Sequence, residues 1–297
     1  MNDESKGMLL GFIGVSAFGL TLPATKIVVA YMDPVFIGLG RAVIAAVLAA
    51  VLLILFRQKL PNRKQFLELV WVGLGVVIGF PVLSSWAMQY VPASHGGVVL
   101  GILPLATAIA GAVVGNERPS LAFWAVGVLG SMLVVSYALL QGSGGIHVAD
   151  IALLGAVLSA AVGYAVGARL SKEMGGWQVI CWALVITLPF ILVPAVVTAP
   201  TTFADMPVNV YACFLYLAVI SQLMGFFVWY KGLALGGTAR VSQMQLFQPF
   251  ITLLASIALL GEALDLQTIV FIVLVVCSVW LGKRMPINMK RREIKVS

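Results

Sequence analysis

Apolar residues fill this chain in ten long runs, and polar residues gather in the short stretches between them. The runs cover residues 7–30, 34–56, 66–87, 94–114, 121–140, 149–170, 178–198, 208–230, 238–260 and 266–284. Each run is close to the ~20 residues that an α-helix needs to cross the hydrocarbon core of a bilayer. The strands of a membrane β-barrel would alternate apolar and polar positions, and the unbroken run Ala42–Phe56 does not. The pattern predicts an all-α integral membrane protein with ten transmembrane helices.

The basic residues indicate how the chain lies in the membrane. With ten spans, both termini are on one side, and that side receives sixteen of the eighteen basic residues: Lys6, Arg57, Lys59, Arg63, Lys64, Arg118, Arg169, Lys172, Lys231, Arg240, Lys283, Arg284, Lys290, Arg291, Arg292 and Lys295. Because cytoplasmic loops are rich in lysine and arginine, we expect both termini in the cytoplasm of a multi-pass protein of the cell inner membrane. The basic tail, residues 285–297, then contacts lipid headgroups of the bilayer. Nucleic acid is not an expected partner, despite the net charge of +7.

Two stretches of the sequence are similar to each other. Tyr90–Glu117 aligns without a gap on Leu235–Glu262 at an offset of 145 residues. The identities include Pro104 with Pro249, Thr107 with Thr252, Ala110 with Ala255 and Glu117 with Glu262. A second alignment, at an offset of 144, sets Gly11, Ala17 and Gly19 against Gly155, Ala161 and Gly163. Proline and glutamate are rare inside the runs, so their coincidence indicates an internal duplication.

Each half of a duplicated chain would hold five spans, over residues 7–141 and 149–284. Five is an odd number, so the second half enters the bilayer upside down relative to the first. Such inverted repeats are a recurrent design of secondary transporters, whose substrate site lies near the midplane where the halves meet. The alternative is a duplicated but rigid scaffold.

Both repeated stretches lead from a proline to a glutamate. The first runs from Pro104 to Gly115-Asn116-Glu117, and the second from Gln248-Pro249 to Leu260-Gly261-Glu262. They resemble the end of the fourth helix in the repeat of the drug/metabolite transporter superfamily, specifically its ten-helix EamA-type members. Arg41, early in the second run, is similar to an arginine of that family. The chain departs from the family at Ser16-Ala17-Phe18-Gly19, where a Trp-Gly pair is frequent, and no arginine replaces Arg41 in the second half.

The resemblance covers nearly the whole chain and is strongest to the aromatic amino-acid exporters. It implies two inverted five-helix repeats that work by alternating access. It also implies amino acids, especially aromatic ones, as cargo.

Several kinds of chemistry are not indicated. All eleven acidic residues lie in tails or at the ends of runs, so a carboxylate-dependent, proton-coupled exporter of cations is not expected. The three cysteines have no CxxC spacing, and the two histidines have no ligand-spaced partners. Gly142-Ser143-Gly144-Gly145 lacks the lysine of a phosphate-binding loop. We therefore expect no cofactor, no metal, no ATPase subunit and no enzymatic activity.

Two basic residues lie well inside the runs. Lys26 is about one turn from the end of the first run, and its long side chain can reach the interface. Arg41 lies about two turns beyond Pro34, where a buried charge needs a partner. It either holds Asp33 or backbone carbonyls across a helix interface, or binds a carboxylate of the substrate.

Prolines inside the runs predict local irregularity, because each removes an N–H group and tends to kink its helix. Pro104 and Pro249 occupy equivalent positions of the two repeats, which makes them candidate hinges for the opening of the halves. The alternative is that they only shape the packing.

A cavity is indicated by polar and aromatic residues at helical spacing. The candidate substrate-binding residues are Thr21, Arg41, Trp86, Gln89, Tyr90, Tyr164, Ser242 and Gln245. The eighth run adds Gln222, Phe226, Trp229 and Tyr230, and the ninth adds Gln243 and Gln248. Amides and hydroxyls are costly against lipid, so they face other helices or a hydrated cavity. Helix–helix hydrogen bonds, at about 0.6 kcal/mol each, explain isolated hydroxyls better than glutamines clustered beside aromatic residues.

The sequence therefore predicts a secondary transporter that moves amino acids, of aromatic or hydrophobic type, and similar small metabolites across the inner membrane, in the direction of export. One alternative is an antiporter of phosphorylated sugars or nucleotide sugars, which would need more cations than Lys26 and Arg41. Another is an integral-membrane enzyme, which would need clustered acids, histidines or arginines at one interface. A third is a noncatalytic scaffold.

Overall fold

The computed structural model describes residues 2–115, 117–141, 148–203, 205–260, 266–285 and 287–289 of the chain. The first half comprises α1 (Asp3–Gly19), α2 (Thr21–Val28), α3 (Pro34–Leu55), α4 (Arg63–Val72), the π-helical η1 (Gly73–Gly79), α5 (Phe80–Ala87), α6 (Ala93–Val99), the 3₁₀-helical η2 (Leu100–Ile102), α7 (Leu103–Gly115), strand β1 (Glu117–Pro119) and α8 (Leu121–Gln141). The second half comprises α9 (Val148–Met174), α10 (Gly176–Val197), α11 (Val208–Tyr216), the π-helical η3 (Leu217–Met224), α12 (Gly225–Gly236), α13 (Thr238–Ser242), the 3₁₀-helical η4 (Gln243–Phe247), α14 (Gln248–Leu260), α15 (Leu266–Arg284) and strand β2 (Ile287–Met289).

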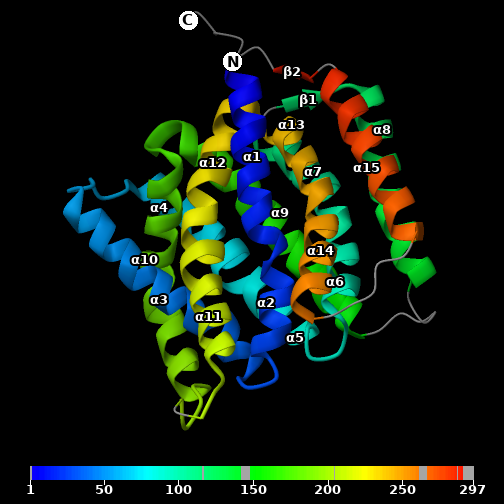
Figure 1. Cartoon of the computed structure of the whole chain (residues 1–297). Helices are drawn as coiled ribbons and strands as arrows, with labels where there is room; N and C mark the ends of the chain where they lie inside the picture. Colours follow the sequence, from blue (N-terminus) through cyan, green and yellow to red (C-terminus); the bar gives the residue numbers. More distant parts are fainter. Residues whose placement is uncertain are drawn as a thin grey trace, which may run out of the picture.

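Many of these elements join end to end into longer spans. In the described chain, eight helical spans are long and apolar enough to cross a bilayer: Asp3–Val28, Pro34–Leu55, Arg63–Ala87, Ala93–Gly115, Val148–Met174, Gly176–Val197, Val208–Gly236 and Thr238–Leu260. They correspond to the first four runs of each half. Helices α8 and α15 hold the fifth position of each half and pack against each other (Figure 1). The chain is thus a multi-pass helical membrane protein, and a total of ten spans stays a prediction.

Local sequence signals set several helix ends. The Asp33 carboxylate accepts a hydrogen bond from the Val35 N–H at 2.8 Å, and Pro34 takes the first helical position of α3, where its missing N–H is not needed. Asn62 and Gln65 form a capping box at the start of α4. These polar caps fix the residues at which α3 and α4 begin.

The two halves run through the molecule in opposite directions (Figure 1). Helix α1 begins beside the end of α12, where Glu4 forms an ion pair with Arg240. Helix α9 begins at the other end of the bundle, where Asp150 lies 2.7 Å from His95 near the start of α6. Strands β1 and β2 pair antiparallel on the side where α1 begins, which we call the terminal side. The halves are therefore inverted, and both ends of the described chain lie on one side; which side faces the cytoplasm stays a prediction.

Backbone irregularities recur at matching places in the two halves. The third span of each half contains a π-helical stretch, η1 or η3, and the fourth contains a 3₁₀-helical stretch, η2 or η4. The 3₁₀ stretches include Leu100 and Gln245, which lie four residues before Pro104 and Pro249. A proline ring crowds the carbonyl group four residues earlier and lacks the N–H that would bond to it, so the regular ladder is lost there. The repeat is thus visible in the backbone as well as in the sequence.

The first span of each half packs closely on the third span of the other half. A Cβ atom added at Gly7 of α1 would lie 2.5 Å from the Gly236 nitrogen in α12. A Cβ atom added at Gly75 of η1 would lie 2.5 Å from the Ser159 carbonyl oxygen in α9. Small residues are what allow helix backbones to approach this closely in a membrane protein. These two crossings interlock the halves around the centre of the bundle.

Candidate substrate cavity

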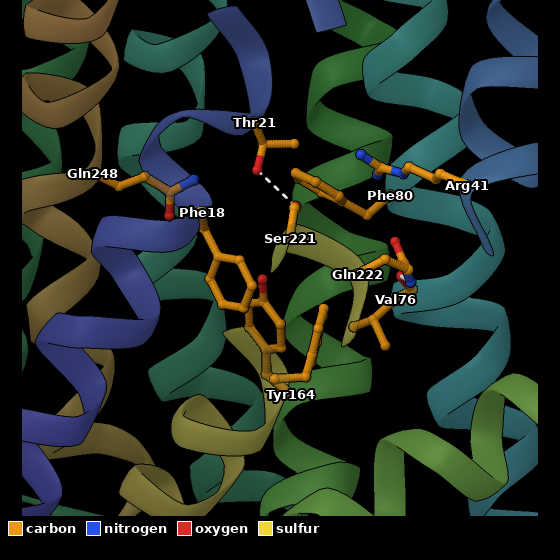
Figure 2. A pocket seen from close by; sticks show the side chains of 10 residues that line it. Phe18, Thr21, Arg41, Val76, Phe80, Tyr164, Ser221, Gln222 and Gln248 are labelled. Atoms are coloured by element: carbon orange, nitrogen blue, oxygen red, sulfur yellow. Dashed lines mark hydrogen bonds between the residues drawn. The ribbon is translucent and has the colours of Figure 1, made fainter. Parts of the chain in front are cut away.

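A small cavity lies between the halves, and ten side chains line it (Figure 2). They are Phe18, Thr21, Arg41, Val76, Phe80, Tyr164, Ser221, Gln222, Phe226 and Gln248. Val76, Gln222 and Gln248 lie within one residue of the midpoints of their spans, which puts the cavity near the membrane midplane. The volume in which the centre of a water molecule can lie is about 10 Å³, so the cavity has room for about one water. Ligand pockets are far larger, roughly 300 Å³ or more, so the cavity in this conformation is too small for a ligand of that size.

The first span reaches the cavity at a break between α1 and α2. Pro23 has no N–H to donate to the Gly19 carbonyl, and the Thr252 hydroxyl donates to that oxygen instead, at 2.7 Å. This bond ties the broken helix to α14 of the other half. The two lining residues of this span, Phe18 and Thr21, stand on either side of the break.

The π-helical stretches form another part of the wall. The Gln222 side-chain amide of η3 donates to the Val76 carbonyl of η1 at 3.0 Å, so the two stretches are joined directly. The Ser221 hydroxyl lies 2.8 Å from the Thr21 hydroxyl, which Figure 2 marks with a dashed line. Single-turn π-helical insertions are frequent at functional sites, because they turn side chains and carbonyls away from the regular pattern.

Arg41 supplies the charge of the cavity. Its side chain projects from α3 toward Phe80 (Figure 2), and the residue is only 1% exposed. Neither Nε nor Nη1 has a hydrogen-bond partner among the described residues. Asp33, the nearest acid in sequence, is occupied in capping its own helix. A buried guanidinium with free N–H groups is suited to a planar anion such as a carboxylate.

Aromatic rings close the cavity toward the terminal side. The Phe226 ring centroid lies 5.0 Å from that of Phe18 and 6.0 Å from that of Tyr164. Trp229, about one turn further along α12, packs 5.4 Å from Tyr164. The Tyr230 hydroxyl donates to a carbonyl of α9 at 3.1 Å. The rings present an apolar surface that an aromatic or aliphatic group can contact.

Three of the predicted binding residues, Thr21, Arg41 and Tyr164, come together at this cavity. Ser242 and Gln245 lie in α13 and η4, buried but not among the lining residues. The Ser242 hydroxyl donates to a carbonyl of its own helix at 2.8 Å. Both amide atoms of Gln245 are buried without a partner among the described residues.

The other predicted binding residues lie away from the cavity, at the end of the third span opposite the terminal side. Trp86 and Tyr90 contact each other with ring centroids 4.8 Å apart, and Tyr90 is 60% exposed. Gln89, between them in sequence, is also exposed. The structure therefore does not bring these three side chains to the cavity that Arg41 lines.

Lys26 and Glu117, two further charged residues singled out in the sequence, have defined contacts. Lys26 donates from Nζ to the Met88 and Val91 carbonyls, at 2.8 and 3.1 Å, beyond the end of α5. Glu117 accepts from the Thr238 and Ala239 N–H groups at the start of α13, each at 2.7 Å. The repeat partner Glu262, the linker 142–147 and the tail 290–297 lie outside the described residues.

Several lining residues were not among the predicted set. Val76, Phe80 and Ser221 carry no sequence signal of their own. The glycines of the stretch Gly73–Gly79, followed directly by Phe80-Pro81, are the signal that marks an irregular helix at this place. Gln222 and Gln248 stand out in the sequence as amides inside apolar runs.

Inverted helical repeats that enclose a polar cavity at mid-depth, with broken helices around it, define the architecture of a secondary transporter. The chain belongs to the EamA-like transporter family, which matches residues 5–139 and again residues 147–282. The double match corresponds to the two inverted halves.

Individual relatives agree with this family. The uncharacterized transporter YdeK of Bacillus subtilis is 42% identical over 284 residues, which cover 96% of this chain and 99% of that protein. A probable terminal-alkyne amino-acid exporter of Streptantibioticus cattleyicolor is 25% identical, with 97% of each chain covered. A probable amino-acid metabolite efflux pump of Salmonella typhimurium is 24% identical, covering 93% of this chain and 94% of that protein. A crystal structure with 16% sequence identity has the same fold, with a TM-score of 0.73 over 94% of this chain and 98% of that chain.

Proposed function

We propose that the protein is an alternating-access exporter of amino acids, of aromatic or hydrophobic type, and of similar small metabolites, in the cell inner membrane. The observation that carries this proposal is the buried Arg41 guanidinium, two of whose nitrogens have no hydrogen-bond partner in the described part of the chain, facing a midplane cavity with aromatic walls. In the proposed complex, Arg41 binds the substrate carboxylate. Phe18, Tyr164 and Phe226 contact the apolar side chain, after the halves have parted enough to admit it.

The relatives support the same substrate class. Two of them are named as a probable exporter of an amino acid and a probable efflux pump of amino-acid metabolites. The charge of the cavity is less suited to sugar phosphates. Lys26 binds carbonyl groups at the end of α5 and is not a lining residue, so the lining residues that the structure describes offer one cation to a dianionic phosphate.

Export can be tested with the full chain in proteoliposomes loaded with labelled phenylalanine or tryptophan, with and without an imposed pH gradient. We expect efflux above that of protein-free liposomes, and a large loss in Arg41→Gln. The matched control is Arg169→Gln, which removes an arginine whose partner is Glu68 at 2.7 Å, away from the cavity lining. Equal flux in Arg41→Gln and in the wild type would refute the role of Arg41.

A further inference from the structure

The charge on the described residues of the cavity lining is of one sign. Among the described residues that line it, Arg41 is the single charged side chain and none is acidic. The other polar groups are hydroxyls and amides, which are neutral. The lining therefore offers a counter-charge to an anion and none to a cation.

A free amino acid brings two charges into this space. Its carboxylate meets Arg41, but the acceptors that the described lining residues offer to its ammonium are all neutral. They include the Gln248 Oε1 atom, which has no partner among the described residues, and the hydroxyl pair of Thr21 and Ser221. The Gln222 amide oxygen and the Tyr164 hydroxyl are further neutral acceptors of the lining. Burial of an ion without a counter-charge is costly, whereas a neutral N–H or O–H satisfies the same acceptors without that penalty.

We infer that the cavity selects monoanionic carboxylates with an apolar or aromatic body, and that the amine is not recognised as a charge. N-acylated amino acids and amine-free aromatic acids are then better substrates than the free amino acid. Amines that lack a carboxylate are excluded. This inference rests on the proposed function only in taking Arg41 as the carboxylate site, and it names the chemical class that the site prefers.

Four compounds with the same phenyl body separate the contributions of the two charges. They are phenylalanine, N-acetylphenylalanine, 3-phenylpropionate and phenylalanine amide. Each is measured as a competitor of labelled-phenylalanine flux in proteoliposomes, and as a thermal stabiliser of the purified full chain. We expect the two monoanions to act at lower concentrations than phenylalanine, and the cationic amide to be weaker than the monoanions by tenfold or more, on the order expected for an unpaired buried charge. An amide that competes as well as phenylalanine, or an N-acetyl derivative that neither competes nor stabilises, would overturn the inference.

Variants of Arg41 test whether its charge causes the selectivity. Arg41→Lys should retain part of the preference for monoanions, and Arg41→Gln should abolish it, while Arg169→Gln leaves it unchanged. If phenylalanine is not transported but 3-phenylpropionate stabilises the wild type and not Arg41→Gln, the amino-acid proposal fails and the carboxylate selectivity stands. If no monoanion stabilises the wild type better than the amide does, the selectivity itself is refuted. Where Arg41→Gln does not fold, the ranking of the four compounds on the wild type decides alone.

Discussion

Glu117 offers the most direct test of how the two halves are held together. It lies just beyond the end of α7 in the first half, and its two carboxylate oxygens accept the first N–H groups of α13 in the second half. The residue is only 4% exposed. A hydrogen bond to a charged group contributes about 1.5–3 kcal/mol, so the pair of bonds should contribute about 3–6 kcal/mol. Glu117→Ala would remove both bonds and leave two N–H groups of α13 without an acceptor.

We expect Glu117→Ala to lower the midpoint of thermal unfolding of the purified protein in detergent. The entropy of unfolding is about 2.1 cal/mol/K per residue, which for 297 residues corresponds to about 1.6 °C per kcal/mol, so the decrease should be roughly 5 °C or more. Glu117→Gln keeps one acceptor oxygen and should show about half of the effect. Glu173→Ala, at an exposed glutamate near the end of α9, is the control and should stay close to the wild type. A midpoint for Glu117→Ala within about 2 °C of the wild type would show that these bonds do not stabilise the closed halves.

The packing and the cavity give three further predictions. Gly7→Val should lower the yield of monodisperse protein on size-exclusion chromatography, because its Cβ would lie 2.5 Å from a backbone nitrogen of α12, whereas Gly115→Ala, with its nearest contact at 3.9 Å, should behave as the wild type. Pro249→Ala should slow flux in proteoliposomes with little change in the unfolding midpoint, since it restores an N–H and a regular helix at the proposed hinge; unchanged flux would argue that the proline only shapes the packing. Tyr164→Ala should raise the apparent KM for transport by roughly tenfold, because an aromatic contact with the substrate is lost. Tyr90→Ala, at an exposed ring, should leave the KM unchanged. The opposite ranking of the two variants would place the site at the end of the third span.

The fold could be predicted from the sequence because its causes are local. Runs of about 20 apolar residues are set by the thickness of the bilayer, and each must form a helix to satisfy its own backbone groups. The inversion of the halves, which Figure 1 shows, is what the predicted odd number of spans in each repeat requires. Pro104 and Pro249 also predicted backbone irregularity, and the 3₁₀-helical stretches η2 and η4 lie directly before them.

The site could be predicted only in part, because helical spacing says which residues share a face but not which way the face points. Ser242 and Gln245 are buried in the fourth span of the second half but do not line the cavity, whereas Gln248 of the same span does. In the third span, the π-helical η1 adds residues to a turn, and each added residue rotates the remainder of the span by about 100° relative to a regular helix. Trp86 and Tyr90 lie beyond that stretch, and distance along the helix also separates them from the cavity, because Trp86 is about 15 Å further along the span than Val76.

The sequence alone determined that this protein lies in a membrane as two inverted helical repeats. The length of each apolar run, the positions of the prolines and the internal duplication can all be read along the chain. Only the tertiary structure decided which side chains meet at its centre. Arg41 illustrates the difference. Its charge is plain in the sequence, but its place in the same cavity lining as Tyr164 depends on how helices of opposite halves pack together. When two residues lie more than a hundred positions apart, the periodicity of the helix that holds each of them does not show whether they meet.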